Sequence, residues 1–122
     1  MDKLDTIFAM QKGFDDDLVR RRSLEDIPTE VWIQRETLAM MSELAELIDE
    51  VNFKWWKDAK PVDPTRVKEE LVDILHFFVS MCLKTGMSAQ ELYDMYLEKN
   101  RENFERQRGN TEREGYASGG DR

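Results

Sequence analysis

Apolar residues recur at spacings of three and four along most of the chain, which is the period of an amphipathic helix. The first such stretch covers residues 3–22. Its stripe consists of Leu4, Ile7, Phe8, Gln11, Phe14 and Leu18. A second stretch runs over 29–58, a third begins at Pro64, and a fourth reaches about Gln107. Because no strand-like alternation of useful length interrupts these stretches, the pattern predicts an all-α protein.

Residues typical of helix ends separate the four stretches. Pro28 lies between the first and the second, since the residue before a proline is disfavoured in a helix. Asp63 is a candidate N-cap, and Pro64 at the first helical position loses no hydrogen bond. Gly86 is suited to the end of the third helix, and Ser88 to the start of the fourth. Short loops between long amphipathic helices predict an antiparallel four-helix bundle.

Composition narrows the class of protein. The chain has 122 residues, with 18 Lys and Arg against 26 Asp and Glu, giving a net charge of −8. We expect one helical domain over 1–108 and a flexible tail over 109–122, which a bound substrate could order. The single cysteine, Cys82, excludes an intrachain disulfide framework and suits a reducing compartment. We expect no secretory signal, no membrane span and no binding of polymeric nucleic acid.

Two pairs of acids stand out within apolar sequence. Glu43 and Glu46 are three residues apart, and so are Glu70 and Asp73. Members of each pair share one side of a helix, and 23 residues with a turn separate the pairs (47–69). Two antiparallel helices joined in this way could bring all four carboxylates together.

A solvated helix face is the alternative explanation, because a chain this acidic should contain roughly five such pairs by chance. The apolar neighbours favour a site instead, since a carboxylate that faces a bundle interior is costly unless it is paired or binds a metal. Oxygen ligands on facing helices suit Mg²⁺ beside phosphates. A ferritin-type iron site would need more than one histidine. His76, the only one, is either a structural histidine or a contact to a sugar hydroxyl.

The motif Glu43-x-x-Glu46 followed by Glu70-x-x-Asp73 resembles that of the all-α nucleotide pyrophosphohydrolases, the MazG-like superfamily. The details are closest to the short phage or bacterial form of the dimeric-type all-α dUTPases. Five further segments are similar to that family: FAMQKGFDDDL at 8–18, NFKWWK at 52–57, EELVDILHF at 69–77, EKNRENFERQ at 98–107, and Gly115-Tyr116. The resemblance covers most of residues 8–116.

The resemblance implies a set of site residues. The four acids would hold one to three Mg²⁺ ions, replaceable by Mn²⁺, and Glu43 or Glu46 would accept the proton of the attacking water. The implied substrate contacts are Gln11, Lys54, Trp56, Lys57, His76, Lys99, Asn103, Arg106 and Tyr116. The lysines and the arginine could instead be ordinary charged surface residues. Trp56 could instead be a core residue.

The resemblance also implies hydrolysis of a deoxynucleoside triphosphate to the monophosphate and pyrophosphate, with dUTP as the first candidate substrate. A broad or dCTP-preferring enzyme of the same superfamily is the nearest alternative. A non-catalytic helical bundle that binds a partner protein is the alternative from another class. Attack at the α or the β phosphorus stays open. We further expect a homodimer or larger homo-oligomer, located in the cytoplasm, or in the host cytoplasm if the protein is phage-encoded.

Overall fold

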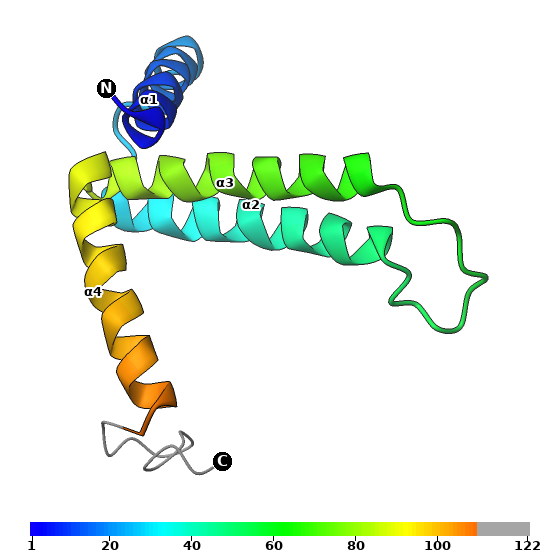
Figure 1. Ribbon diagram of the computed structural model, residues 1–122. Coiled ribbons are helices and arrows are strands. Elements are labelled where there is room, and N and C mark those ends of the chain that lie inside the picture. The colour runs from blue at the N-terminus through cyan, green and yellow to red at the C-terminus, as the bar shows by residue number, and fades with distance from the viewer. Residues whose placement is uncertain (110–122) are drawn as a thin grey trace. The chain divides into compact units, whose positions relative to one another are not determined.

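The computed structural model describes residues 1–109 and contains four helices (Figure 1). They are α1 (Lys3–Arg22), α2 (Thr29–Glu50), α3 (Pro64–Lys84) and α4 (Ala89–Gln107). No strand occurs among these residues. The predicted all-α class with four helices is therefore confirmed. The expectation of a flexible tail falls almost entirely outside the described residues.

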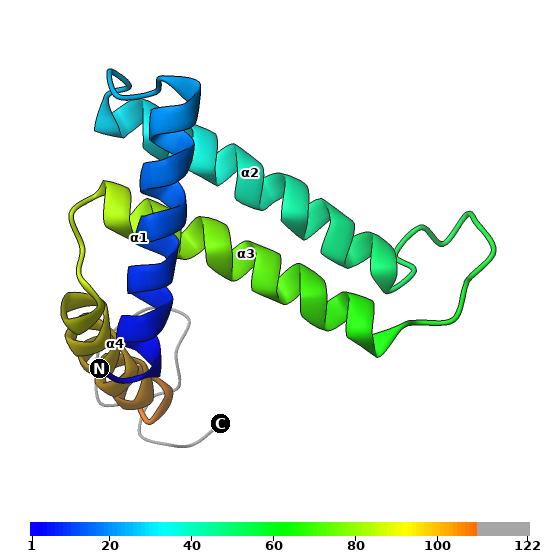
Figure 2. The ribbon, with the colours of Figure 1, turned by 90° about the horizontal axis from the view of Figure 1, so that it is seen from above.

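The chain divides into two compact units, Met1–Met87 and a second that begins at Ser88 and contains α4. Within the first unit, α2 and α3 lie side by side and run antiparallel, as predicted (Figure 1). Helix α1 packs across α3, which Figure 2 shows from above. The first unit thus brings side chains of three helices to a common region.

The helix ends follow the predicted punctuation. The Asp63 side chain accepts a hydrogen bond from the Thr65 amide at 3.0 Å, so it caps α3. At the other end of α3, Gly86 adopts φ 81°, a left-handed conformation that glycine reaches without strain. The Ser88 hydroxyl accepts a hydrogen bond from the Glu91 amide at 3.1 Å and caps α4. These three boundaries are confirmed.

Helix α2 is shorter than predicted, because it ends at Glu50 rather than at Asp58. Asn52 follows with φ 59°, the left-handed conformation that often ends a helix. Its side chain donates to the Lys60 carbonyl at 2.8 Å and accepts from the Lys60 amide at 3.0 Å. These two hydrogen bonds join Asn52 to Lys60 across the 51–63 loop. Trp56 therefore lies in a loop and not on the predicted helix.

Most of the apolar side chains of α2 are not part of the buried core. The core of the first unit is centred instead on Phe8, Val79 and Cys82, which are buried. The α2 side chains that stay exposed are Leu38, Met41, Leu44, Ile48 and Val51. On α3 the exposed ones include Leu71, Leu75 and Phe78. Many large apolar side chains of α2 and α3 are therefore exposed among the residues that the structure describes.

Candidate active site

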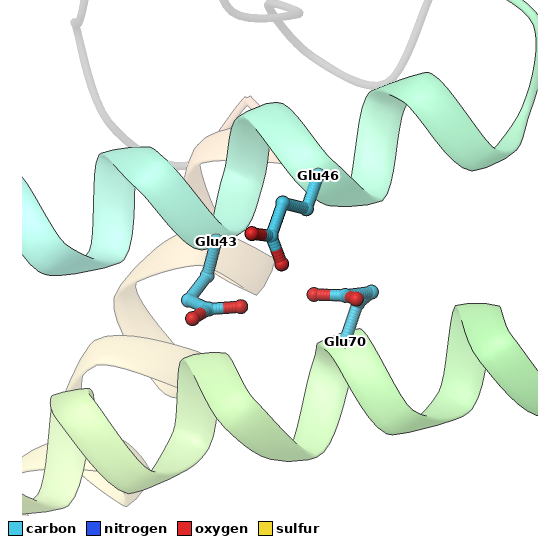
Figure 3. Close-up of side chains that lie close together, drawn as sticks. All are labelled: Glu43, Glu46 and Glu70. Carbon is cyan, nitrogen blue, oxygen red and sulfur yellow. The ribbon is translucent and has the colours of Figure 1, made fainter.

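Three of the four predicted acids meet between α2 and α3. Glu43 and Glu46 project from α2 toward Glu70 on α3 (Figure 3). One carboxylate oxygen of each residue lies within 4.8 Å of those of the other two. The spacing of three on α2 puts both glutamates on one side of that helix, and the antiparallel packing presents α3 to them. We call these three residues the acid cluster.

The electrostatics of the acid cluster favour a bound cation. Among the described residues, no group hydrogen-bonds to the buried Oε2 atoms of Glu43 and Glu70. Partial burial, the adjacent Glu43 carboxylate and the charge of Glu46 raise the pKa of Glu70 from 4.5 to about 7. Like charges held close together, with unpaired buried oxygens, are costly unless a cation or protons neutralise them. The cluster therefore fits a hard divalent ion with oxygen ligands.

The raised pKa of Glu70 predicts an unusual pH dependence of stability. Without divalent cations, the folded state binds a proton at Glu70 between about pH 4.5 and 7 that the unfolded chain releases. This group's contribution to the free energy of unfolding is therefore complete below pH 4.5 and lost as pH rises through 7. Urea unfolding across this range should show the loss in the wild type but not in Glu70→Gln. Adding Mg²⁺ above pH 7 should restore wild-type stability, and an identical pH profile of both proteins would contradict the assignment.

A cavity of about 560 Å³ lies beside the acid cluster, lined by residues of α1, α2 and α3. Its apolar wall consists of Met10, Phe14, Leu18 and Phe77. Its polar lining consists of Gln11, Asp15, Glu36, Glu43, Asp73, His76 and Ser80. Asp73 is exposed and lines this cavity together with Glu43, but it is not one of the three acids gathered within 4.8 Å. The fourth predicted metal ligand thus lines the cavity but does not belong to the acid cluster.

Two predicted substrate contacts, Gln11 and His76, are brought together in this cavity. The Gln11 Oε1 atom is 2.8 Å from Nδ1 of His76. The Gln11 Nε2 atom donates to Oδ1 of Asp15 at 2.9 Å. Residues of two helices, 65 positions apart in the sequence, are thereby joined in one hydrogen-bonded chain.

A buried polar network that the sequence did not predict continues from Asp15. The Ser80 hydroxyl lies 2.7 Å from Asp15 Oδ2 and 2.9 Å from Glu36 Oε1. The Lys84 ammonium lies 3.4 Å from Asp15 Oδ2 and 3.6 Å from Glu36 Oε1. It also lies 4.4 Å from the Trp32 ring centroid, within cation–π range. One lysine thus lies within ion-pair distance of two buried carboxyl groups that line the cavity.

Glu36 is the member of this network with a shifted protonation equilibrium. Burial raises the pKa of Glu36, although the Ser80 hydrogen bond and the Lys84 charge act in the opposite direction. A hydroxyl carries one hydrogen, so Ser80 cannot donate to Asp15 and Glu36 at the same time. The Lys84 ammonium is the second donor near both carboxyl groups.

Of the three consecutive acids Asp15–Asp17, a run that favours a solvated helix face, Asp15 is buried instead. Asp16 and Asp17 are the solvated members, and Asp16 pairs with Lys12 at 2.7 Å. The signal for Asp15 was its place four residues after Gln11, on the side of α1 that carries Phe8. Glu36 and Ser80 gave no comparable signal, because single polar residues inside apolar stretches are common at solvated positions as well.

The three predicted contacts that follow α2 lie in the loop and do not line the cavity beside the acids. Lys54 and Lys57 line a smaller cavity of about 270 Å³ within the 51–63 loop. The Lys54 ammonium is 3.5 Å from Oδ1 of Asp49. Trp56 is 59% exposed and meets Trp55 edge-on. Their contact with a substrate stays a prediction.

The predicted phosphate contacts on α4 belong to the second unit. Arg106 Nη1 lies 3.4 Å from Oδ1 of Asn103. Glu102 lies 3.8 Å from the Lys99 ammonium and 3.6 Å from Nη2 of Arg106. These residues therefore share one polar face of α4, as their spacing predicts. Tyr116, the last predicted contact, lies outside the described residues.

Comparisons with known proteins agree with the family resemblance of the sequence. The chain is 36% identical over 87 residues to a dCTP pyrophosphatase of Enterobacteria phage T4, an alignment that covers 60% of this chain and 51% of that protein. A dCTP pyrophosphatase of Enterobacteria phage LZ5 is 36% identical over 74 residues, covering 61% of this chain and 43% of that protein. The chain thus spans about half the length of these relatives. No solved structure matches it. A sequence model described as dUTPase matches residues 3–91, well over half of the chain, which therefore belongs to the dUTPase family, an all-α group of nucleotide pyrophosphohydrolases.

Proposed function

We propose that this protein hydrolyses a pyrimidine deoxynucleoside triphosphate to the monophosphate and pyrophosphate in the presence of a divalent cation. The observation that carries the proposal is the acid cluster, in which two buried carboxylate oxygens lack partners among the described residues, beside a cavity of about 560 Å³. That volume is within the range of small-molecule sites. The names of the family and of the two phage relatives support both dUTP and dCTP as candidates.

The chemistry assigns roles to the chain's own residues. Glu43, Glu46 and Glu70 would hold Mg²⁺, and Asp73, which lines the cavity together with Glu43, would be the fourth acid of the site. When bound, the ion would neutralise phosphate charge and make a coordinated water more acidic. Glu43 or Glu46 accepts the proton of the attacking water as its oxygen bonds to phosphorus and the phosphoanhydride bond breaks. The leaving group departs with the electron pair of that bond, and either the α or the β phosphorus fits this description.

The cavity suits the nucleoside end of such a substrate. Phe14 and Phe77 offer aromatic surface, while Gln11 and His76 offer polar atoms at one wall. A few placed polar groups in an otherwise apolar pocket are typical of small-molecule sites. Lys99 and Arg106 would contact the phosphates if α4 contributes to the site, because guanidinium and ammonium groups bind phosphate oxygens.

Pyrophosphate release tests the proposal. The untagged protein is incubated with Mg²⁺, with Mn²⁺ or with a chelator, and with dUTP, dCTP, the other deoxynucleotides and the ribonucleotides. We expect release from dUTP, dCTP or both, abolished by the chelator. Equal release from every nucleotide would favour the broad-specificity alternative. If the folded protein releases pyrophosphate from no nucleotide, the result would favour the alternative of a non-catalytic helical bundle that binds a partner protein.

We also propose that the exposed apolar stripe of α2 mediates self-association. Met41, Leu44 and Ile48 are 58%, 49% and 47% exposed and follow one another at helical spacing. A contiguous apolar surface of this kind is unusual on a monomer. Leu44→Arg should shift the protein to monomer in analytical ultracentrifugation, whereas Gln34→Arg, which adds the same charge elsewhere on α2, should not. A monomeric wild type would contradict the proposal.

The remaining expectations concern location and partners. Within residues 1–109, no single helix has the length and apolar content to cross a membrane, and only α3 and α4 taken together pass that test. The net charge of −8 is unfavourable for polymeric nucleic acid, whose binding requires a basic surface. We place the protein in the cytoplasm, where nucleoside triphosphates are found.

A further inference from the structure

The Asp15 carboxylate is surrounded by hydrogen-bond donors. The Ser80 hydroxyl donates to Oδ2 at 2.7 Å, and the Lys84 ammonium lies 3.4 Å from the same atom. The Gln11 side chain approaches the other oxygen, Oδ1, at 2.9 Å. An ionised carboxylate can only accept hydrogen bonds. The Gln11 amide must therefore turn its nitrogen toward Asp15.

The orientation of Gln11 determines the tautomer of His76. Because the Gln11 nitrogen is engaged by Asp15, the Gln11 oxygen faces Nδ1 of His76 at 2.8 Å. A carbonyl oxygen has no hydrogen to donate, so Nδ1 must carry the proton of this bond. In the neutral ring the other nitrogen, Nε2, is then left with its lone pair. His76 lines the cavity, so the free acceptor belongs to the wall of the proposed substrate site.

We propose that Asp15 and Gln11 hold His76 as the Nδ1–H tautomer, so that Nε2 accepts a hydrogen bond from an O–H or N–H group of the nucleoside. Asp15 and Gln11 are positioning residues in this arrangement, and Nε2 of His76 selects the ligand. The substrate part of the inference rests on the proposed function. Three nucleoside groups have this chemistry: the sugar 3′-hydroxyl, the amino group of cytosine and the imide N–H of uracil.

The tautomer can be measured directly, because His76 is the only histidine of the chain. A long-range ¹H–¹⁵N correlation spectrum of the untagged protein contains one imidazole, and a pH series identifies its neutral form. We expect the nitrogen shifts of an Nδ1–H ring. A neutral ring protonated at Nε2 would overturn the proposal.

Two matched variants test what fixes the ring. Gln11→Met removes the acceptor for Nδ1–H and should move the neutral ring toward Nε2–H, the form that an unconstrained histidine prefers. Gln90 donates to Asp94 at 2.9 Å in α4, the same four-residue spacing as Gln11 and Asp15. Gln90→Met should therefore leave the imidazole spectrum unchanged. An Nδ1–H ring that persists in Gln11→Met would show that Gln11 does not set the tautomer.

Substrate analogues identify the donor. A 2′,3′-dideoxynucleotide lacks the hydroxyl, a 4-desamino analogue of dCTP lacks the amine, and N3-methyl-dUTP lacks the imide N–H. We expect kcat/KM to fall roughly tenfold or more for the analogue whose donor meets Nε2, and the fall to vanish in His76→Phe. A wild type that does not discriminate against any of them would overturn the assignment of Nε2. Absence of turnover with every nucleotide would instead count against the hydrolase proposal, since the tautomer is measured without turnover.

Discussion

Replacing Glu46 with glutamine should reduce pyrophosphate release by a factor of roughly 10²–10⁴ while the helices remain folded. The glutamine keeps the size of the side chain but removes a charge from the acid cluster and, if Glu46 is the general base, the proton acceptor as well. Glu46 is an exposed residue that reaches toward Glu70 from α2, so its replacement disturbs no buried packing (Figure 3). Steady-state kinetics with saturating Mg²⁺ and a circular dichroism spectrum measure the two effects.

Glu50→Gln is the matched control for this experiment. Glu50 lies one helical turn beyond Glu46 on α2, but its carboxylate is 3.7 Å from Arg66 and it is not in the acid cluster. Its replacement should change kcat only slightly. The loss of kcat in Asp73→Asn distinguishes two roles. It should equal the loss in Glu46→Gln if Asp73 is a full metal ligand, and it should lie between the losses of the other two variants if Asp73 only adds negative charge near the ion. Wild-type turnover in Glu46→Gln would refute the assignment of the acid cluster.

The thermal stability of Glu46→Gln gives a second test, which distinguishes a functional acid cluster from one that only stabilises the fold. In the absence of metal, partial burial raises the pKa of Glu70, and the neighbouring Glu43 and Glu46 carboxylates, which repel it, raise that pKa further. Removing one charge relieves the repulsion. The metal-free Glu46→Gln protein should therefore melt at the same temperature as the wild type or above it, whereas Mg²⁺ should stabilise only the wild type strongly. Loss of activity together with unchanged or increased stability is the expected pair of results.

The sequence predicted those features of the site that depend on helical spacing. Glu43 and Glu46 share a face because they are three residues apart, and Glu70 meets them because the helices form an antiparallel hairpin. The loop was not predicted correctly, because Asn52 ends α2 through a left-handed backbone and two side-chain hydrogen bonds to Lys60. The apolar residues after Asn52 continue the helical period, so the sequence pattern did not indicate that α2 ends there.

The buried network shows a different limit of sequence reasoning. Asp15 lies in a run of three acids, and composition alone cannot tell which member faces inward. Its partner Ser80 is 65 residues away, and Lys84 reaches it only because α1 crosses α3 (Figure 2). Such contacts depend on the packing of helices, which spacing along one helix does not encode. The net charge of −8 therefore includes two groups of acids with different surroundings: the acid cluster, and the buried pair Asp15 and Glu36 beside Lys84.

Replacing Lys84 with methionine should destabilise the protein by about 3–5 kcal/mol, the usual cost of removing one partner of a buried ion pair. Only 15% of the Lys84 side chain is exposed, against 11% for Asp15 and 9% for Glu36. Methionine keeps most of the apolar length of the side chain, but it removes the ammonium and with it the cation–π contact to Trp32, and it leaves two carboxylates in a poorly solvated region without a cation. Urea unfolding at pH 7 measures the loss in the free energy of unfolding.

A surface pair provides the contrast. Arg20 lies 2.7 Å from Asp17, with 74% and 43% of their side chains exposed, and Arg20→Met should cost at most about 1 kcal/mol. The distance between Arg20 and Asp17 is shorter than either distance from Lys84 to its two acids. A larger loss in the free energy of unfolding for Lys84→Met would therefore show that burial, and not the length of the contact, determines the destabilisation.

The pH dependence of the lysine variant tests the cause of the loss. Burial already raises the pKa of Glu36, and removing Lys84 takes away one of the groups that lower it. A carboxyl whose folded-state pKa is raised contributes stability that is present at low pH and lost as pH rises through that pKa. The deficit of Lys84→Met should therefore shrink in acid. The double variant Lys84→Met/Glu36→Gln should recover part of it at pH 7, because one uncompensated charge is removed with its partner. A deficit that is the same at every pH and in the double variant would mean that Lys84 stabilises the fold through its cation–π contact with Trp32 and not through its ion pairs with Asp15 and Glu36.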